Sequence, residues 1–170
     1  MTDIESRVAE LVDQFRQIGA TQMRDLPIYN PCLDVEAVGF QAFGERWIGV
    51  LITPWFMNAI LLPPVKTVLD NRVIGQKSQE VLPAATYAFF NGGVEGAGSY
   101  KSLPLYSPMG AFKSQDSARR EAQARLLALL TEPAEVAKPA MREQGTPAEA
   151  PNPGRRAFLR VQKIACGHKA

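Results

Sequence analysis

The chain has 170 residues, with 19 Lys and Arg against 17 Asp and Glu, 46% hydrophobic residues and two cysteines. This length is typical of one domain with an additional segment. A net charge of +2 is too small to attract nucleic acid or an anionic membrane through the whole surface, and two cysteines cannot form a four-ligand zinc site. A partner therefore has to be inferred from particular sites.

The N-terminal twenty residues contain acids and lack the basic start and apolar run of a secretory signal. The sequence therefore predicts a cytoplasmic protein. Because the cytoplasm is reducing, we expect Cys32 and Cys166 to be free thiols.

The first predicted element is a helix. Apolar residues recur at helical spacing from Ile4 to Ile18, and Gly19 is placed to end the helix. Residues 23–31 contain two prolines and predict a structured loop.

Several strands are predicted in the middle of the chain. Residues 35–40 and 47–53 read as strands, and the second is continuously apolar and β-branched, as in a buried central strand. Two further strands are predicted over 86–90 and 99–105, separated by a turn that begins at Asn91–Gly93.

A second helix is predicted near residue 115. Pro104 should break the last strand, and Ser114 should cap a helix whose apolar face runs from Ala118 to Leu130 before Pro133 ends it. A helix, consecutive strands and a helix predict an α+β fold: a mainly antiparallel sheet packed by the N-terminal and C-terminal helices in two layers.

The stretch 47–65 contains no charged residue and has to be compared with a transmembrane helix. Pro54, Asn58 and the Pro63–Pro64 pair argue against a helix, because proline removes a backbone hydrogen bond and clashes with the preceding turn. Two short buried segments that meet at Thr53–Pro54 fit better, so no integral membrane insertion is predicted.

The composition changes after the second helix. Residues 1–132 form the predicted domain, and residues 133–154 are rich in Pro, Ala and Glu. Such a segment cannot bury enough apolar surface to order its backbone, so we predict a flexible linker. Residues 155–170 form a basic tail with five basic and no acidic side chains.

The predicted domain lacks the combinations of residues that form common catalytic sites. The single histidine, His168, lies near the C-terminus, so neither a Ser-His-Asp nor a Cys-His arrangement can form in the domain. His168 and Cys166 supply at most two metal ligands, and residues 92–101 are glycine-rich without the spacing of a phosphate-binding loop. We predict a protein that is not an enzyme and has no metal or cofactor.

Three loops instead combine aromatic residues or methionine with proline and a small polar group. They are residues 26–31, 53–58 and 105–109. Such side chains offer large, adaptable contact areas for a hydrophobic peptide segment. The alternative, which we favour for Trp55, Phe56 and Met57, is that they belong to the core, since most clustered aromatic residues are buried.

Four segments in the same part of the chain resemble a known family. They are LPIYNPCLDVEAVGF (26–40), WIGVLITPWFMNAILLPP (47–64), LPAATYAFF (82–90) and SYKSLPLYSPMGAF (99–112). In this order they resemble the HybE/HupJ family of [NiFe]-hydrogenase assembly chaperones. The resemblance implies an α+β fold and a cytoplasmic, non-catalytic maturation chaperone for an uptake hydrogenase. Its partners would be hydrogenase subunit precursors, above all the small subunit with its twin-arginine signal, which it would bind during cofactor insertion and before export. Other maturation proteins would be further partners.

The matched loops supply candidate client-binding residues. They are Tyr29, Asn30, Pro31, Thr53, Pro54, Trp55, Phe56, Met57, Asn58, Tyr106, Ser107, Pro108 and Met109. Some members of the family carry a fused rubredoxin domain, which needs four cysteines, and Cys32 and Cys166 do not supply one.

The basic tail contains GRRAFLR at 154–160, which reads like a twin-arginine signal at the wrong end of the chain. A chance basic tail and a short helix packed on the domain are two interpretations. In a third, the tail mimics the precursor's signal: Arg155 and Arg156 meet an acid such as Asp34 or Glu36, and Phe158 and Leu159 enter an apolar pocket.

An alternative function also rests on the basic tail. The chain would then be a non-catalytic adaptor that binds peptides or a membrane surface through residues 155–170, with strongly salt-dependent binding.

Overall fold

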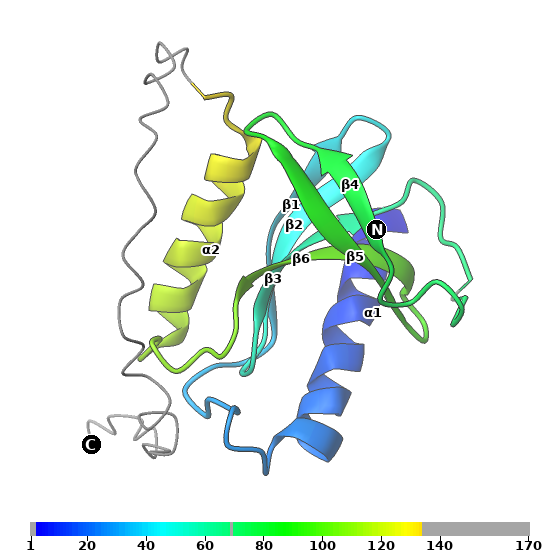
Figure 1. Cartoon of the computed structure of the whole chain (residues 1–170). Coiled ribbons are helices and arrows are strands. Elements are labelled where there is room, and N and C mark those ends of the chain that lie inside the picture. Colours follow the sequence, from blue (N-terminus) through cyan, green and yellow to red (C-terminus); the bar gives the residue numbers. More distant parts are fainter. Residues whose placement is uncertain (1–2, 69, 134–170) are drawn as a thin grey trace, which may run out of the picture.

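The computed structural model describes residues 3–68 and 70–133, in which two helices lie on opposite faces of one antiparallel sheet (Figure 1). Helix α1 spans Asp3–Ile18 and helix α2 spans Gln115–Leu130. The predicted α+β class and antiparallel sheet are confirmed. The layers number three instead of two, because each helix covers its own face of the sheet.

Six strands form the sheet in the order β1-β2-β3-β6-β5-β4, and every pair of neighbours is antiparallel. Their bounds are Glu36–Phe43 (β1), Arg46–Ile52 (β2), Met57–Leu62 (β3), Lys77–Val81 (β4), Thr86–Val94 (β5) and Gly98–Tyr106 (β6). The connection 63–76 carries the chain from β3 to the far edge of the sheet, so that β6 returns to pair with β3.

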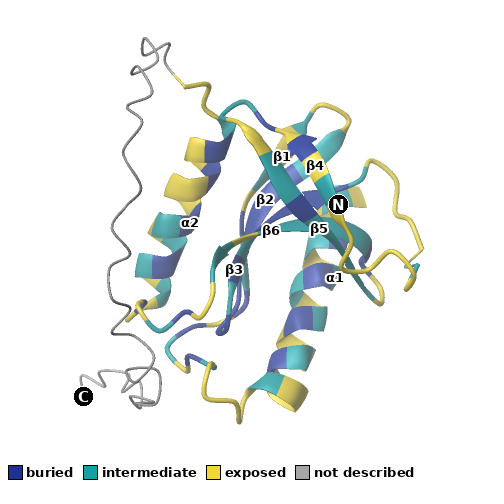
Figure 2. Cartoon of the chain, viewed as in Figure 1, coloured by how far each residue is buried: buried dark blue, intermediate teal, exposed yellow. Residues whose placement is uncertain are grey.

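The central strands β2 and β3 are buried on both faces (Figure 2). Ile48 and Val50 belong to the core on the side of α2, whereas Leu51 belongs to the core on the side of α1. Full burial of each such side chain stabilises the fold by about 1.5–3 kcal/mol. The uncharged stretch is therefore two short buried segments that meet near Thr53–Pro54, as predicted, although the strand β3 in the second segment was not predicted. No helix among the described residues has the length and apolar character to cross a membrane.

Helix α2 follows the predicted pattern closely. Ser114 caps it by accepting a hydrogen bond from the Ser117 backbone amide, and Ala118, Ala122 and Leu126 are buried against the sheet. The predicted linker at 133–154 and tail at 155–170 lie outside the described residues, apart from Pro133.

The first α-helix ends at Ile18, as predicted from Gly19, but the chain does not leave the helical path there. The chain continues as a π-helix over Gly19–Met23. A Cβ atom at Gly19 would lie 3.1 Å from the Trp55 ring, so this glycine serves the close approach of an aromatic side chain. The sequence pattern alone cannot distinguish this role from helix termination.

Two strand predictions also need correction. Asn91–Gly93 lie inside β5, and the chain turns at 95–97 instead. Gly92 is a glycine for another reason, since it faces the Tyr100 ring at a distance that leaves no room for a Cβ atom. Pro104 stays within β6, since β6 pairs with β5 only as far as Ser102 and the ladder shifts register nearby.

The edge strand β4 was not predicted. Its sequence, KSQEV, is polar and largely exposed, so it shows no alternation of apolar and polar residues. Strand β4 forms because its backbone pairs with β5 in a hairpin, which does not require apolar side chains.

Gly98 fixes the start of the 63–76 connection, and we expect Gly98→Ala to be strongly destabilising. Its φ angle is +82°, and a Cβ atom would lie 2.7 Å from the Thr67 carbonyl oxygen. Gly75 has a similar φ of +81° with open space around it, so Gly75→Ala is the matched control. Gly98→Ala should cost about 1 to 3 kcal/mol more than Gly75→Ala, because overpacking adds to the shared backbone strain. Urea denaturation measures both, and equal losses would contradict the close contact.

Candidate functional site

The three proline-containing loops meet around one buried side chain, Asn30. Its Nδ2 atom donates hydrogen bonds to the Met109 oxygen at 2.9 Å and to the Phe112 oxygen at 2.8 Å. Its backbone amide donates to the Pro54 oxygen at 2.8 Å. A single residue therefore joins segments that are far apart in the sequence, at the end of the sheet where β2 and β6 finish and α2 begins.

Thr53 shapes the turn between β2 and β3. Its hydroxyl oxygen accepts hydrogen bonds from the Phe56 amide at 2.9 Å and from the Trp55 amide at 3.3 Å, and its own amide donates to the Phe56 oxygen at 2.8 Å. The threonine side chain thus replaces water as the partner of the turn's amides. The turn is held in one shape.

Trp55 lies under the surface at this end of the molecule, with 7% of its area exposed. Its ring stacks on Tyr29 with centroids 6.2 Å apart and meets the edge of Phe56 at 5.7 Å and Phe15 at 6.4 Å. The favoured interpretation of Trp55 and Met57 as core is confirmed by their burial, and Phe56 is half-buried.

The candidate client-binding residues fall into three groups by exposure. The buried ones are Asn30, Thr53, Pro54, Trp55, Met57 and Met109, the half-buried ones are Tyr29, Phe56, Asn58 and Tyr106, and the exposed ones are Pro31, Ser107 and Pro108. In this conformation the buried group can only hold the loops in position. Direct contact with a client is open to the other two groups, and their binding role stays a prediction.

Asn58 does not find a partner for its whole amide. Buried polar groups are ordinarily hydrogen-bonded, yet the Oδ1 atom of Asn58 is buried and has no hydrogen-bond partner among the described residues. It faces the side of the sheet that α1 covers, opposite Leu51.

A pocket of about 360 Å³ opens beside this cluster. Tyr29, Pro31 and Pro54 line it together with Asp34 and two arginines from the end of α1 and the following turn, Arg16 and Arg24. Sequence reasoning missed the arginines, because nothing in the pattern of an amphipathic helix indicates which polar side chains border a distant loop.

Two aliphatic side chains extend the apolar surface next to this pocket. Leu26 and Ile28 are 44% and 43% exposed on the loop that leads to Tyr29. Exposed aliphatic side chains beside a pocket are typical of a surface that binds another protein.

Of the two acids suggested as partners for the tail arginines, only Asp34 borders the pocket. Glu36 is already paired with Arg119, whose Nε and Nη2 atoms lie 2.6 and 3.1 Å from the Glu36 oxygens. Arg155, Arg156, Phe158 and Leu159 lie outside the described residues, so their placement is not tested.

Glu36 should contribute to stability only at pH values where it is ionised. The hydrogen bond from Arg119 holds the pKa of Glu36 below its usual value of 4.5. A lowered carboxyl pKa stabilises the fold above the unfolded-state pKa, and this stabilisation is lost as the pH falls through the folded-state pKa. In Glu36→Gln, stability should therefore depend less on pH below pH 4.5 than it does in the wild type. Thermal unfolding from neutral to acid pH measures this dependence. The exposed Glu45→Gln is the control, and equal curves for wild type and Glu36→Gln would contradict the pairing.

Tyr106 anchors the third loop to α2. Its hydroxyl donates to Glu121 at 2.7 Å, and the Arg125 guanidinium donates to the same hydroxyl at 2.7 Å while covering the ring. The hydrogen bonds from Tyr106 and Arg125 lower the pKa of Glu121. Ser107 and Pro108, joined by a cis peptide bond, follow as the exposed tip.

Cys32 is not the free thiol that the sequence analysis predicted. It forms a disulfide bond in the structure. The other cysteine of the chain, Cys166, lies outside the described residues.

The site consists of buried groups that position three loops and of an exposed rim of apolar and polar side chains. Within 3–68 and 70–133, no group of three His, Cys, Asp or Glu side chains could hold a metal ion. Fold and site together define an α+β domain in which three proline-containing loops are joined at one end of the sheet.

Comparison with known proteins gives this domain its family. Residues 6–161 match the family described as [NiFe]-hydrogenase assembly, chaperone, HybE. The chain is 41% identical over 150 residues to the hydrogenase expression/formation protein HupJ of Bradyrhizobium diazoefficiens, covering 88% of this chain and 85% of that protein. The chain therefore belongs to the HybE family of [NiFe]-hydrogenase assembly chaperones, as its resemblance indicated.

Two further relatives show the range of the similarity. The chain is 38% identical over 126 residues to the probable rubredoxin HupJ of Rhodobacter capsulatus. The aligned region covers 74% of this chain but only 45% of that protein's length. The solution structure of HybE from Escherichia coli is 27% identical, with a TM-score of 0.61 over 94% of this chain and 92% of that one.

Proposed function

We propose that this chain is a non-catalytic cytoplasmic chaperone that binds the precursor of an uptake [NiFe]-hydrogenase small subunit, with its twin-arginine signal, during cofactor insertion and before export. Family membership supports the role in hydrogenase assembly. The observation that carries the rest is the junction at Asn30, which brings three proline-containing loops to one surface.

The exposed rim of this surface would make the contacts. Leu26 and Ile28 offer apolar area next to the 360 Å³ pocket, and Pro31 lies at its mouth. A signal peptide combines guanidinium groups with apolar side chains, and both find counterparts here. Asp34 supplies a carboxylate at a pocket that Arg16 and Arg24 also line, with Arg16 lying 3.5 Å from Asp13. The aliphatic pair supplies the apolar contact.

The buried residues would act indirectly in this proposal. Thr53 and Asn30 fix the backbone of two loops, so the rim is ordered before a client arrives. Preorganisation lowers the entropy cost of binding, which matters for a client segment that is itself unfolded.

The test is fluorescence polarisation with a labelled twin-arginine signal peptide and a second peptide in which both arginines are lysine. Ile28→Ser should weaken binding of the twin-arginine peptide by about tenfold through lost apolar contact. Asp34→Asn should weaken it by about two- to fivefold and reduce the preference for arginine over lysine.

Val81→Ser is the matched control, since Val81 is an exposed aliphatic residue on β4, away from the Asn30 loops. Equal binding of both peptides by wild type, or an effect of Val81→Ser as large as that of Ile28→Ser, would contradict the proposal. The client is then identified by comparing the binding of three proteins: the full-length small-subunit precursor, the same subunit without its signal, and the large-subunit precursor.

A further inference from the structure

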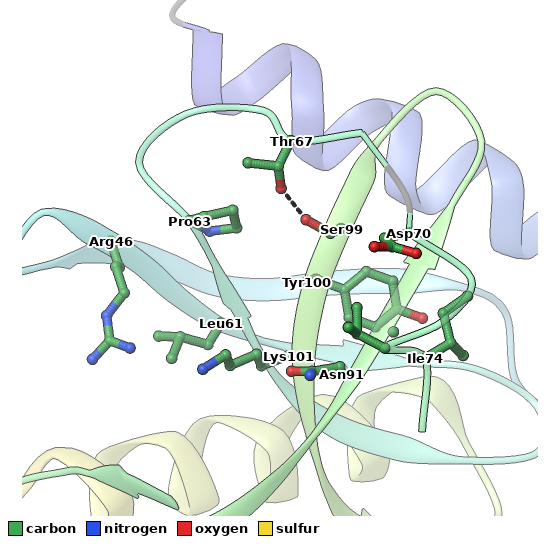
Figure 3. A pocket seen from close by; sticks show the side chains of 12 residues that line it. Arg46, Leu61, Pro63, Thr67, Asp70, Ile74, Asn91, Ser99, Tyr100 and Lys101 are labelled. Atoms are coloured by element: carbon green, nitrogen blue, oxygen red, sulfur yellow. Dashed lines mark hydrogen bonds between the residues drawn. The ribbon is translucent and has the colours of Figure 1, made fainter. Parts of the chain in front are cut away.

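A second pocket, of about 350 Å³, lies at the opposite end of strands β2, β3 and β6 from the Asn30 loops (Figure 3). Its walls come from the start of β2 at Arg46, the end of β3 at Leu61, the start of β6 at Lys101, and the 63–76 connection. None of the predicted client-binding residues lines it.

The charges at this pocket do not cancel. Arg46 lies 2.5 Å from one oxygen of Glu80, and Lys101 bonds the other oxygen of the same carboxylate. Asp70 also lines the pocket, but its two oxygens are bound by Arg72 at 3.1 and 3.2 Å. Three cations thus share two carboxylates, which leaves one positive charge in excess.

This excess charge is partly shielded from water. The Glu80 side chain is 9% exposed, and those of Arg46 and Lys101 are 34% and 36% exposed. Burial raises the pKa of Glu80, but Lys101 and Arg46 together outweigh it and hold that pKa below its usual value, so the carboxylate is ionised at neutral pH. A further anion at the pocket would balance the remaining cation.

Besides the polar side chains of Thr67, Asn91 and Ser99, the pocket has an apolar part that reaches the surface. Leu61 lies on its sheet side and Ile74 on the side of the connection (Figure 3). Val73 and Ile74, which line the pocket, are themselves 39% and 44% exposed. A small ligand would be satisfied by the pocket alone, whereas exposed aliphatic residues around it favour a protein surface as the occupant.

The pocket is held open from both ends of the connection. The Ser99 amide donates to the Thr67 oxygen at 3.1 Å. The Gly75 amide donates to the Asn91 oxygen at 2.7 Å, and the Asn91 amide donates to the Gln76 oxygen at 2.9 Å. Because these bonds fix the walls beforehand, little order has to be gained on binding.

We infer that this pocket docks a segment of a protein partner in which an acidic side chain stands next to a branched apolar side chain. The acid meets Lys101 and Arg46 beside Glu80, and the apolar side chain enters between Leu61 and Ile74. This site differs from the proposed signal-binding surface in place, because the two pockets share no lining residue.

The experiment is an NMR titration of the full chain with acetyl-Glu-Leu-amide, with acetyl-Gln-Leu-amide as the uncharged control. We expect chemical-shift changes at Ser99, Lys101 and Ile74, and about two- to fivefold tighter binding of the Glu peptide, the range for a partly exposed ion pair. Equal affinity for the two peptides, or shifts confined to the Asn30 loops, would overturn the inference.

Two variants separate the charge from the apolar contact. Lys101→Met leaves Arg46 paired with Glu80 and should abolish the preference for Glu over Gln. Ile74→Ser should weaken the binding of both peptides by about tenfold, and Val81→Ser, at an exposed position, is the control. Thermal unfolding of each variant verifies the fold, and wild-type selectivity in folded Lys101→Met would refute the role of the charge.

Other occupants give distinct results. Octanoate that binds the pocket while the Glu peptide does not would identify a small amphiphile. Sedimentation that shows a dimer broken by Ile74→Ser would identify a second copy of the chain. Either result would overturn the inference and leave the signal-peptide measurements unaffected.

Discussion

Replacing Trp55 with alanine is expected to lower the free energy of unfolding by about 3 to 5 kcal/mol, the cost of removing a large aromatic side chain from a core. The ring fills the space between Gly19, Phe15 and Tyr29 and is 7% exposed. Nothing smaller can occupy that volume without moving α1 or the loop before Asn30. Urea denaturation followed by circular dichroism measures the loss.

Trp55→Phe and Leu127→Ala are the controls. The first keeps an aromatic ring at the site and should lose less stability than alanine, and the second removes a side chain that is 69% exposed and should change little. A Trp55→Ala protein that stays as stable as wild type but no longer binds the signal peptide would make Trp55 a direct client anchor instead of a core residue.

Asn30→Ala should cost about 2 to 5 kcal/mol, because it leaves the Met109 and Phe112 oxygens buried without a donor. Asn30→Asp should cost more, since a carboxylate placed against two carbonyl oxygens is repelled by both. Beyond stability, the loss of the junction should separate the three loops. Signal-peptide affinity should therefore fall even where the domain remains folded.

Asn71→Ala is the matched control, because Asn71 is exposed in the 63–76 connection. Stability and peptide affinity should both stay at wild-type values in that variant. If Asn30→Ala unfolds at the wild-type urea concentration, the hydrogen bonds from Asn30 do not hold the loops together, and the proposed client surface loses its structural basis.

The sequence by itself determined the local elements and the family. Helical spacing from Ile4 to Ile18 and the Ser114 cap predicted both helices, because these signals act within a few residues. The uncharged stretch was correctly divided into two short buried segments, since the prolines forbid a long helix, but only the first was predicted to be a strand. The motifs that carry the family resemblance lie in these elements and the loops beside them.

Only the tertiary structure decided how the elements combine. The polar strand β4 and the role of Gly92 beside Tyr100 depend on pairing between consecutive strands, which the apolar pattern does not indicate. The three layers depend on neighbours distant in the sequence. The same holds for the two sites: Asn30 binds oxygens 79 and 82 positions away, and Glu80 takes its cations from β2 and β6. Hydrogen bonds and ion pairs of this kind form only once the sheet has brought their partners together, so local sequence patterns carry no trace of them.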